Sequence, residues 1–366
     1  MNTTQRELIM QRWSIVQQEL IPELRSEVGP LTPKLEKVIH TLEWVRIEEF
    51  VESAWRGVGR PPHDRGALAS AFVAKAVLGL TTTEALIERL KMDRALRRIC
   101  GFPMWKRIPD PSTFSRAFDE FAQAKLAYRV HEALIKEHLG QALIGHISRD
   151  GTAIEAREKP ARKEKTLPAP QAKRGRPHKH EVREPKLKTI PQQLSQSLTE
   201  MLAALPQACD CGTKCNAQGY KVSWNGYKLH LDTADCGVVV SALLTSASVH
   251  DSQTAIPLAL MTQGRVTHCY DLMDAAYCSA EIRSHSRSLG HVPLIDHNPR
   301  GGEKIAFDPA QKQRYKERSQ AERANARLKD EFGGKQIWVR GPVKVMSHLM
   351  LGVLVLAADQ LMRLLT

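Results

Sequence analysis

Hydrophobic positions divide the chain into a helical first part and a mixed second part. Up to about residue 139, apolar residues recur every three or four positions and β-branched alternation is scarce, which predicts helices. One stripe consists of Leu35, Val38, Leu42 and Val45. A second apolar stripe, which contains Leu68, Phe72, Val73 and Val77, ends at Gly79. A further helix is predicted to begin at Asp110-Pro111, with Asp as N-cap and Pro in the first turn, and to continue to Leu134.

Two short helices are predicted to meet at a tight turn near residue 80. The helical pattern resumes behind Thr81-Thr82-Thr83-Glu84, which has the spacing of a capping box. Basic residues follow this turn: Arg97, Arg98, Lys106, Arg107 and Arg116. Helix, turn and helix with nearby cations is compatible with docking on DNA, and a solvated helical bundle fits the pattern equally well.

Strand patterns dominate the beginning of the second part, so we expect a mixed α/β region there. Runs of apolar and β-branched residues occur at 143–150, 227–231, 238–244, 266–273 and 292–295. The predicted organisation is a helical segment at 1–60, a helical DNA-binding domain at 61–139 and an α/β domain at 140–366, with 157–208 as a basic linker or insertion. A last helix, Val343 to Leu365, is apolar around most of its circumference, which indicates core or oligomer packing.

Composition narrows the class of protein. The 366 residues include 53 Lys+Arg and 40 Asp+Glu, a formal net charge of +13, and 42% of them are hydrophobic. This excludes wholesale disorder and favours a polyanionic partner such as nucleic acid. The N-terminus has no apolar signal-peptide core, and the longest uncharged apolar run, Val345 to Ala358, is too short to cross a bilayer. We therefore expect a cytoplasmic protein and no membrane partner.

The predicted linker carries much of the excess charge. Residues 157–188 contain 12 Lys+Arg and 4 Asp+Glu, a net charge of +8. Within them, Arg174 and Arg176 belong to a Lys-Arg-Gly-Arg-Pro run that resembles an AT-hook, whose arginines reach into a narrow minor groove. A solvated linker that only follows phosphates explains the same composition.

One charged helix is the most informative segment. At about 100° per residue, the side chains of Tyr315, Arg318, Glu322 and Lys329 fall on one narrow face of a helix predicted over 311–332. A carboxylate flanked by cations suits a metal ligand that faces phosphate. A solvated face with an Arg318–Glu322 ion pair is the alternative.

Two aspartates stand where predicted strands end. Asp150 follows the first strand of the second part, and Asp274 follows the strand over 266–273. Together with Glu322 they would form an oxygen-rich site suited to Mg²⁺ or Mn²⁺, the ions that assist phosphodiester displacement. Asp271 is the main rival of Asp274, because residues three apart on a strand point to opposite faces and only one can join the cluster.

With these residues in view, the sequence resembles the DDE transposases of bacterial insertion sequences, in the clade that their classification numbers four and five. The signature Tyr, two residues, Arg, three residues, Glu, six residues, Lys is met in full by Tyr315, Arg318, Glu322 and Lys329. The DGT at Asp150 and the DAAY at Asp274 are similar to the family's two Asp motifs. The resemblance covers most of the chain.

The resemblance implies an α/β fold with an RNase H-like mixed-sheet catalytic domain, preceded by an all-helical N-terminal domain. It further implies that Asp150, Asp274 and Glu322 hold two Mg²⁺ or Mn²⁺ ions, and that Tyr315, Arg318 and Lys329 contact the DNA of the transposon end. The implied reaction is strand cleavage at terminal inverted repeats and joining of 3′-ends to target DNA. A homodimer in a prokaryotic cytoplasm, associated with the nucleoid, is expected.

Other functions remain open at this point. An inactive or repurposed DNA-binding protein, or a structure-selective nuclease on the same fold, would share most of these features. Cys209, Cys211 and Cys215 invite a zinc interpretation, although free thiols fit their spacing better. The adjacent His250-Asp251 favours a loop cap over a catalytic pair. Trp224 and Trp338 are candidates either for stacking on a base or for burial near the sheet.

Overall fold

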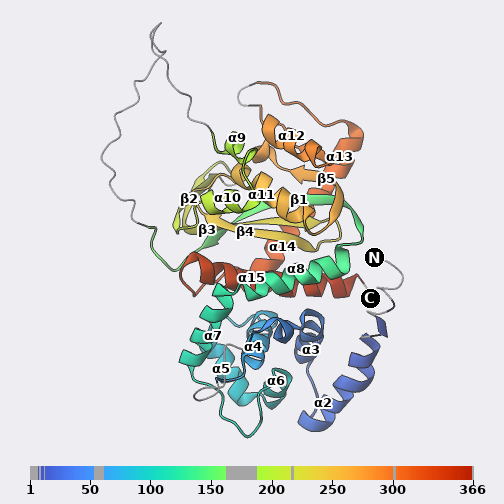
Figure 1. The fold of residues 1–366 in the computed structure, drawn as a ribbon, viewed down its shortest axis with the longest axis vertical. Coiled ribbons are helices and arrows are strands. Elements are labelled where there is room, and N and C mark those ends of the chain that lie inside the picture. Colours follow the sequence, from blue (N-terminus) through green and yellow to red (C-terminus); the bar gives the residue numbers. More distant parts are fainter. Residues whose placement is uncertain are drawn as a thin grey trace.

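A helical part and an α/β part share one hydrophobic core (Figure 1). The computed structural model describes residues 7, 10–11, 13–52, 62–161, 188–215, 218–299 and 302–364. The last long helix, α15 (Pro342–Arg363), and the long helix α8 (Leu126–Leu139) cross the middle of the molecule between the sheet and the other helices. Because one core contains residues of both parts, the predicted limits at residues 60 and 139 stay predictions.

The first part is helical, as its hydrophobic pattern predicts. Its elements are the π-helix η1 (Val16–Leu20), α2 (Ile21–Val28), α3 (Pro33–Val45), the 3₁₀ turn η2 (Ile47–Phe50), α4 (Arg65–Val77), α5 (Thr83–Met92), α6 (Arg94–Ile99), α7 (Pro111–Gln123) and α8. The helix that begins after Asp110 is shorter than expected, because Lys125 adopts a left-handed φ of 50° and separates α7 from α8. The cap of α5 is Thr82, one residue later than a capping box with Glu84 requires.

Six strands form one mixed sheet. They are β1 (Leu143–Glu155), β2 (Asp210–Cys215), β3 (Lys221–Ala234), β4 (Val239–Ser246), β5 (Thr267–Met273) and β6 (Val292–Ile295). β3 pairs antiparallel with β1 on one side and with β2 and β4 on the other, whereas β1, β5 and β6 are parallel. Three long antiparallel strands continued by parallel ones are the mixed sheet expected for an RNase H-like domain.

Helices cover both faces of this sheet. The remaining elements are α9 (Thr189–Gln193), α10 (Leu198–Ala204), η3 (Asp251–Thr254), α11 (Ala255–Gln263), η4 (Ala275–Tyr277), α12 (Ala280–Ser288), α13 (Pro309–Tyr315), η5 (Lys316–Arg318) and α14 (Ser319–Asp330). α14 packs on β1 and β3, while α11 and α12 pack on strands of the same sheet from the opposite face.

Three expectations about these elements need correction. β1 continues to Glu155, so Asp150 lies inside a strand and not at its end. The tract at 157–208 closes with the helices α9 and α10 and is followed by β2, a strand that the hydrophobic pattern did not indicate. The predicted helix at 311–332 is interrupted by the 3₁₀ turn η5, which separates α13 from α14.

Helix α15 is the core helix of the molecule. It is the one described helix that is long and apolar enough to cross a membrane, but 78% of its most hydrophobic window is buried inside the protein. It packs on α8, α4, α7 and β4. Its buried Asp359 receives ion pairs from Lys37, Arg327 and Arg363. Core packing, one of the two roles expected for this helix, is thus the one observed.

Candidate active site

Two aspartates lie side by side at the end of the β1–β5 ladder. The parallel pairing of these strands ends at Arg149 and Met273, and the next residue on each strand is Asp150 and Asp274. Because parallel strands reach the same edge together, the sheet holds both carboxylates at one place. The backbone of Asp150 is also held by the strand on the other side of β1, because it pairs with Leu231 of β3.

Helix α14 and the residue before it bring two polar side chains to Asp150, and one of them also binds Glu322. Asn325 donates a hydrogen bond of 3.0 Å from Nδ2 to Asp150 Oδ2. Arg318, just before the helix, holds its Nη1 3.7 Å from Asp150 Oδ1 and donates from Nη2 to Glu322 Oε1. The Glu322 side chain is 59% exposed. Arg318 therefore lies between the carboxylates of Asp150 and Glu322.

The electrostatics of the pair show an excess of negative charge. Burial raises the pKa of Asp150 to about 6, against the opposing effect of Arg318, and the neighbouring Asp274 raises it further. Burial likewise raises the pKa of Asp274, although the Ala276 N–H and Arg318 act to lower it. Carboxylates that one arginine leaves undercompensated favour binding of a further cation.

The other two residues of the helical signature border the same place. The Tyr315 hydroxyl donates to the Met273 carbonyl oxygen at 3.0 Å, and burial raises its pKa to about 12. Burial also lowers the pKa of Lys329, as does the nearby charge of Lys214, while Asp150 acts in the opposite direction. The break at η5 thus leaves all four signature side chains around the aspartates, although they are not on one continuous helix.

The oxygens of Asp150, Asp274 and Glu322 do not all lie within 4.8 Å of one another. Within the described residues, only His268, Asp271 and His291 bring three ligand atoms within 4.8 Å of one another. Two buried polar atoms of the site lack a hydrogen-bond partner, Arg318 Nη1 and Asn325 Oδ1. An all-oxygen donor set beside a guanidinium nitrogen that makes no hydrogen bond fits a hard divalent cation together with a phosphate oxygen.

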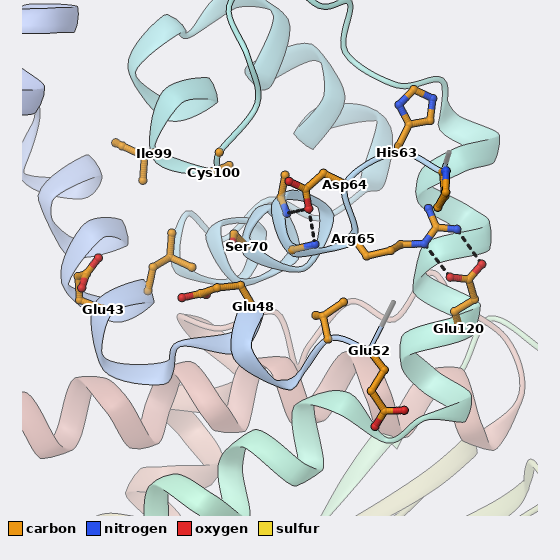
Figure 2. A pocket seen from close by; sticks show the side chains of 16 residues that line it. Glu43, Glu48, Glu52, His63, Asp64, Arg65, Ser70, Ile99, Cys100 and Glu120 are labelled. Carbon is orange, nitrogen blue, oxygen red and sulfur yellow. Dashed lines mark hydrogen bonds and ion pairs between the residues drawn. The ribbon is translucent and has the colours of Figure 1, made fainter. Parts of the chain in front are cut away.

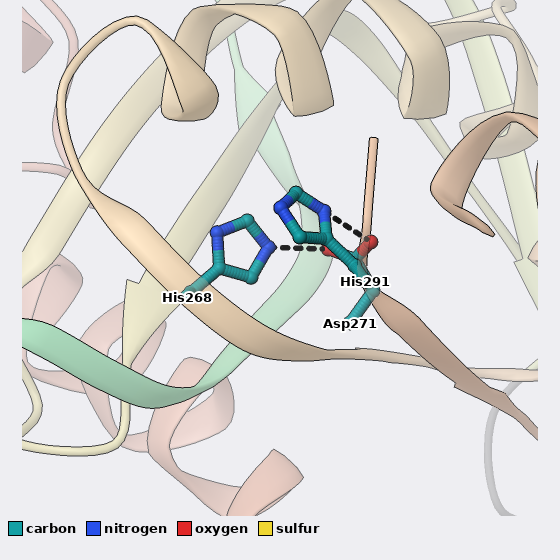
Figure 3. Close-up of side chains that lie close together, drawn as sticks. All are labelled: His268, Asp271 and His291. Carbon is teal, nitrogen blue, oxygen red and sulfur yellow. Dashed lines mark hydrogen bonds and ion pairs between the residues drawn. The ribbon is translucent and has the colours of Figure 1, made fainter. Parts of the chain in front are cut away.

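Asp271, the rival of Asp274, belongs to a buried network on the other face (Figure 3). His268 Nε2 and His291 Nδ1 lie 3.1 and 3.4 Å from its two oxygens, and Ser286 donates to Oδ2. Arg149 lies 3.8 Å away. Burial alone would raise the pKa of Asp271, but the hydrogen bonds of both histidines and the charge of Arg149 hold it well below its ordinary value. The carboxylate of Asp271 is therefore already bound by these buried partners, on the face of the sheet opposite to Asp150.

Family comparisons agree with this geometry. The model of a "Transposase domain (DUF772)" matches residues 22–120, and that of a "Transposase DDE domain" matches residues 207–357, which together span about two thirds of the chain. The chain belongs to the DDE transposases. The numbered clade stays a prediction. Neither a search of curated proteins nor one of solved structures finds a match.

This membership fixes the class of chemistry. A DDE transposase is a divalent-metal-dependent enzyme that acts on DNA in transposition and recombination, and its catalytic domain has the RNase H-like fold described above. The matched region of the DDE model contains Asp274 and Glu322, whereas Asp150 precedes it.

One site residue, Asn325, escaped the sequence reasoning, and Gly151 entered it only as part of the DGT motif. Asn325 stands three positions after Glu322, a helical neighbour that the stripe analysis could have included. Gly151 of the DGT motif is required by packing, because a Cβ there would lie 2.9 Å from His230 Nδ1 and 3.1 Å from Asp251 Oδ1. Asp251 itself forms an ion pair of 3.0 Å with Lys228.

Among the described residues, no hydrogen bond or ion pair joins the remaining candidates to Asp150, Asp274 or Glu322, although the charge of His250 acts to lower the pKa of Asp274. Arg174 and Arg176 lie outside the described residues. Cys209 is buried while Cys211 and Cys215 are exposed, and all three are free thiols. His250 caps η3 by accepting from the Ser252 N–H, as the loop-cap interpretation predicts. Separately, Trp224 is buried and donates to the Tyr227 carbonyl, whereas Trp338 is 48% exposed.

A cavity of about 790 Å³ lies in the helical part and has the wrong charge for DNA. Figure 2 shows carboxylates from several elements along its wall: Glu43, Glu48, Glu52, Asp64 and Glu120. Arg65 is paired with Glu120 and Asp64 caps α4, so these groups have structural partners. A phosphate backbone would be repelled here, which leaves other faces of the molecule for DNA.

Proposed function

We propose that this transposase cleaves DNA at the terminal inverted repeats of its element and joins the 3′-ends to target DNA, with Asp150, Asp274 and Glu322 as the metal ligands. The observation that supports the proposal is the register of β1 and β5, which brings Asp150 and Asp274 to the same edge, together with Arg318, which bridges Asp150 and Glu322. Two Mg²⁺ or Mn²⁺ ions suit these oxygen ligands.

The chain's own residues hold the DNA for this reaction. Arg318 exchanges its carboxylate partners for an oxygen of the scissile phosphate, to which Nη1, now without a hydrogen bond, can donate. Lys329, at the far end of α14, contacts the next part of the backbone. The Tyr315 hydroxyl is held by the end of β5 and positions the strand beside Asp274. Bound divalent ions would activate the attacking hydroxyl or water and stabilise the departing 3′-oxygen.

The assembly and location are also part of the proposal. Two transposon ends must be processed together, which favours a homodimer in the complex that pairs them. The net charge of +13 supports association with the nucleoid in a prokaryotic cytoplasm.

Cleavage and joining on end DNA test the assignment directly. With Mg²⁺, the wild-type protein is expected to nick a duplex that carries the element's terminal repeat and to join its 3′-end to a circular target. Asp150→Asn, Asp274→Asn and Glu322→Gln are each expected to lose both reactions while binding is retained. Asp330→Asn removes an exposed carboxylate from the same helix as Glu322 and is the matched control.

Each alternative gives a different result. Wild-type activity in any of the three variants would remove that residue from the site. Cutting without joined products would indicate a nuclease, and end binding without either reaction in any divalent metal would indicate a DNA-binding protein alone.

A further inference from the structure

A second, basic cleft lies where the helical part meets the end of α14. Its volume is about 420 Å³, and its walls come from the α4–α5 turn, the start of α7, Phe332-Gly333 and residues 338–344. Four cationic side chains line it: Lys75, Arg157, Arg340 and Lys344. Glu84 is the single carboxylate of the lining. In charge, this basic cleft is the opposite of the acidic cavity in Figure 2.

Lys75 is the most unusual group of the basic cleft. The residue is only 9% exposed, and within the described part of the chain its ammonium group has neither a hydrogen bond nor an ion pair. The Nζ atom is not among the fully buried unpaired atoms, so the stem is buried while the ammonium group opens into the cleft. Burial lowers its pKa to about 8, although Glu84 acts to raise it. A cation that is largely desolvated and has no protein partner is stabilised by an anion, so the cleft favours an anion that enters and pairs with Lys75.

Backbone dipoles add to the attraction for an anion. The first residues of α5 line the basic cleft, together with Thr81 and Thr82, and so does Pro111 at the start of α7. Helix N-termini present unpaired N–H groups and a partial positive charge, which favour phosphate oxygens. Hydroxyl and ammonium donors therefore converge in the basic cleft with the start of α5, while α7 contributes its dipole but no N–H from Pro111.

The basic cleft and the active site are connected by the elements that carry the catalytic carboxylates. α14 runs from Glu322 toward Phe332 in the cleft wall, a rise of about 15 Å for ten residues. β1 leaves Asp150 and leads to Arg157, at most about 23 Å farther along the chain. Lys329 lies between the two places.

We propose that the basic cleft binds a backbone phosphate of the transposon end, about four to seven base pairs from the cleaved bond, with Lys75 as its ammonium partner. The interval follows from the two path lengths divided by the rise of about 3.4 Å per base pair. Its position on the DNA rests on the proposed function, because the cleaved bond is the reference point. The phosphate contact itself requires only the cleft.

A neutral-linkage scan tests the proposal. End duplexes carry one methylphosphonate each, at successive positions from the cleaved bond, and binding is measured with full-length protein in EDTA. One linkage in the predicted interval is expected to weaken wild-type binding about tenfold. Lys75→Met is expected to weaken binding of the unmodified duplex by a similar factor, to lower the salt slope by about one and to be insensitive to that linkage.

Matched controls separate the possible outcomes. Lys91→Met removes an exposed lysine from α5 and should keep the full sensitivity to that linkage. Lys75→Met should melt at the same temperature or higher, because it removes an unpaired charge from a largely buried side chain. If Lys75→Met binds like wild type or keeps the sensitivity to every linkage, the basic cleft is not a DNA phosphate site.

A free phosphate is the other source of the same chemistry. If millimolar inorganic phosphate raises the melting temperature of wild type but not of Lys75→Met, and no linkage shows coupling, the ligand is a small anion and the DNA proposal is wrong. Absence of strand cleavage in Mg²⁺ would refute the proposed function alone, since the linkage scan is read without metal.

Discussion

The raised pKa of Asp150 means that its ionised form lowers the stability of the folded protein. Asp150→Asn imitates the protonated side chain with nearly the same shape, and the new amide oxygen can still accept from Asn325. We therefore expect this substitution to abolish catalysis and, in the absence of metal, to stabilise the fold. An ordinary structural aspartate would show the opposite effect on stability.

The size of this stability effect follows from the rise in the pKa of Asp150. The pKa rises from 3.8 to about 6, and each unit corresponds to about 1.4 kcal/mol, so the ionised carboxylate costs up to about 3 kcal/mol. The side chain is 21% exposed, so solvent screening leaves most of this value. A raised carboxyl pKa means that the cost is fully present above about pH 6, declines at lower pH and is absent below the unfolded value. About half of it remains at pH 5.

Thermal melting of the full-length protein measures this directly. In EDTA at pH 8, Asp150→Asn should melt several degrees above wild type, and the difference should shrink at pH 5. Added Mg²⁺ should also reduce the difference, because the metal stabilises only the wild-type carboxylate. Asp330→Asn should change little under all three conditions. If Asp150→Asn melts below wild type in EDTA at pH 8, the carboxylate is not under electrostatic strain and the reasoning is refuted.

Three further predictions concern the site and its support. The cleavage rate should fall as the pH drops through about 6, because Asp150 must be ionised to bind metal; a rate that is flat from pH 5 to 8 would contradict this. Arg318→Met should move that acid limb to higher pH, because the Arg318 charge lowers the pKa of Asp150, and it should weaken binding of end DNA. Leu354→Ala in α15 should destabilise the protein by about 2–5 kcal/mol, and calorimetry should show the helical and α/β parts unfolding in one transition.

The positions of most elements followed from hydrophobic periodicity, because buried faces impose it. α3, α4, β4, β5 and α15 agree with their patterns to within a few residues. β2 was missed because five of its six residues are not buried, so no alternation marks it. The break at η5 was missed because Lys316 to Arg318 are compatible with a helix, and the Ser148 hydrogen bond to the Glu317 carbonyl that accompanies the turn is a tertiary contact.

The site was predictable only in part for a similar reason. The Tyr-Arg-Glu-Lys spacing is local and can be recognised in a sequence, but the pairing of Asp150 with Asp274 depends on strand register, which links positions far apart in the chain. Lys75 is a residue whose role the local sequence does not indicate at all. It lies in an apolar helical stripe, where its burial without a partner can be known only from the packing of α4 against its neighbours.

The buried network behind the site explains how that register is maintained. Arg149 precedes Asp150 and points to the opposite face of β1, where it forms a two-pronged hydrogen bond with Asp232 of β3 and lies near Asp271 of β5. It therefore ties β1 to both neighbouring strands at the level of the catalytic carboxylates. A slip of β1 by one residue would exchange the two faces and bury Asp150 beside Asp232 and Asp271 without a cation. Because burying unpaired charge costs several kcal/mol, the network penalises the wrong register strongly, and the spacing of the acidic site depends on a charge cluster that DNA never touches.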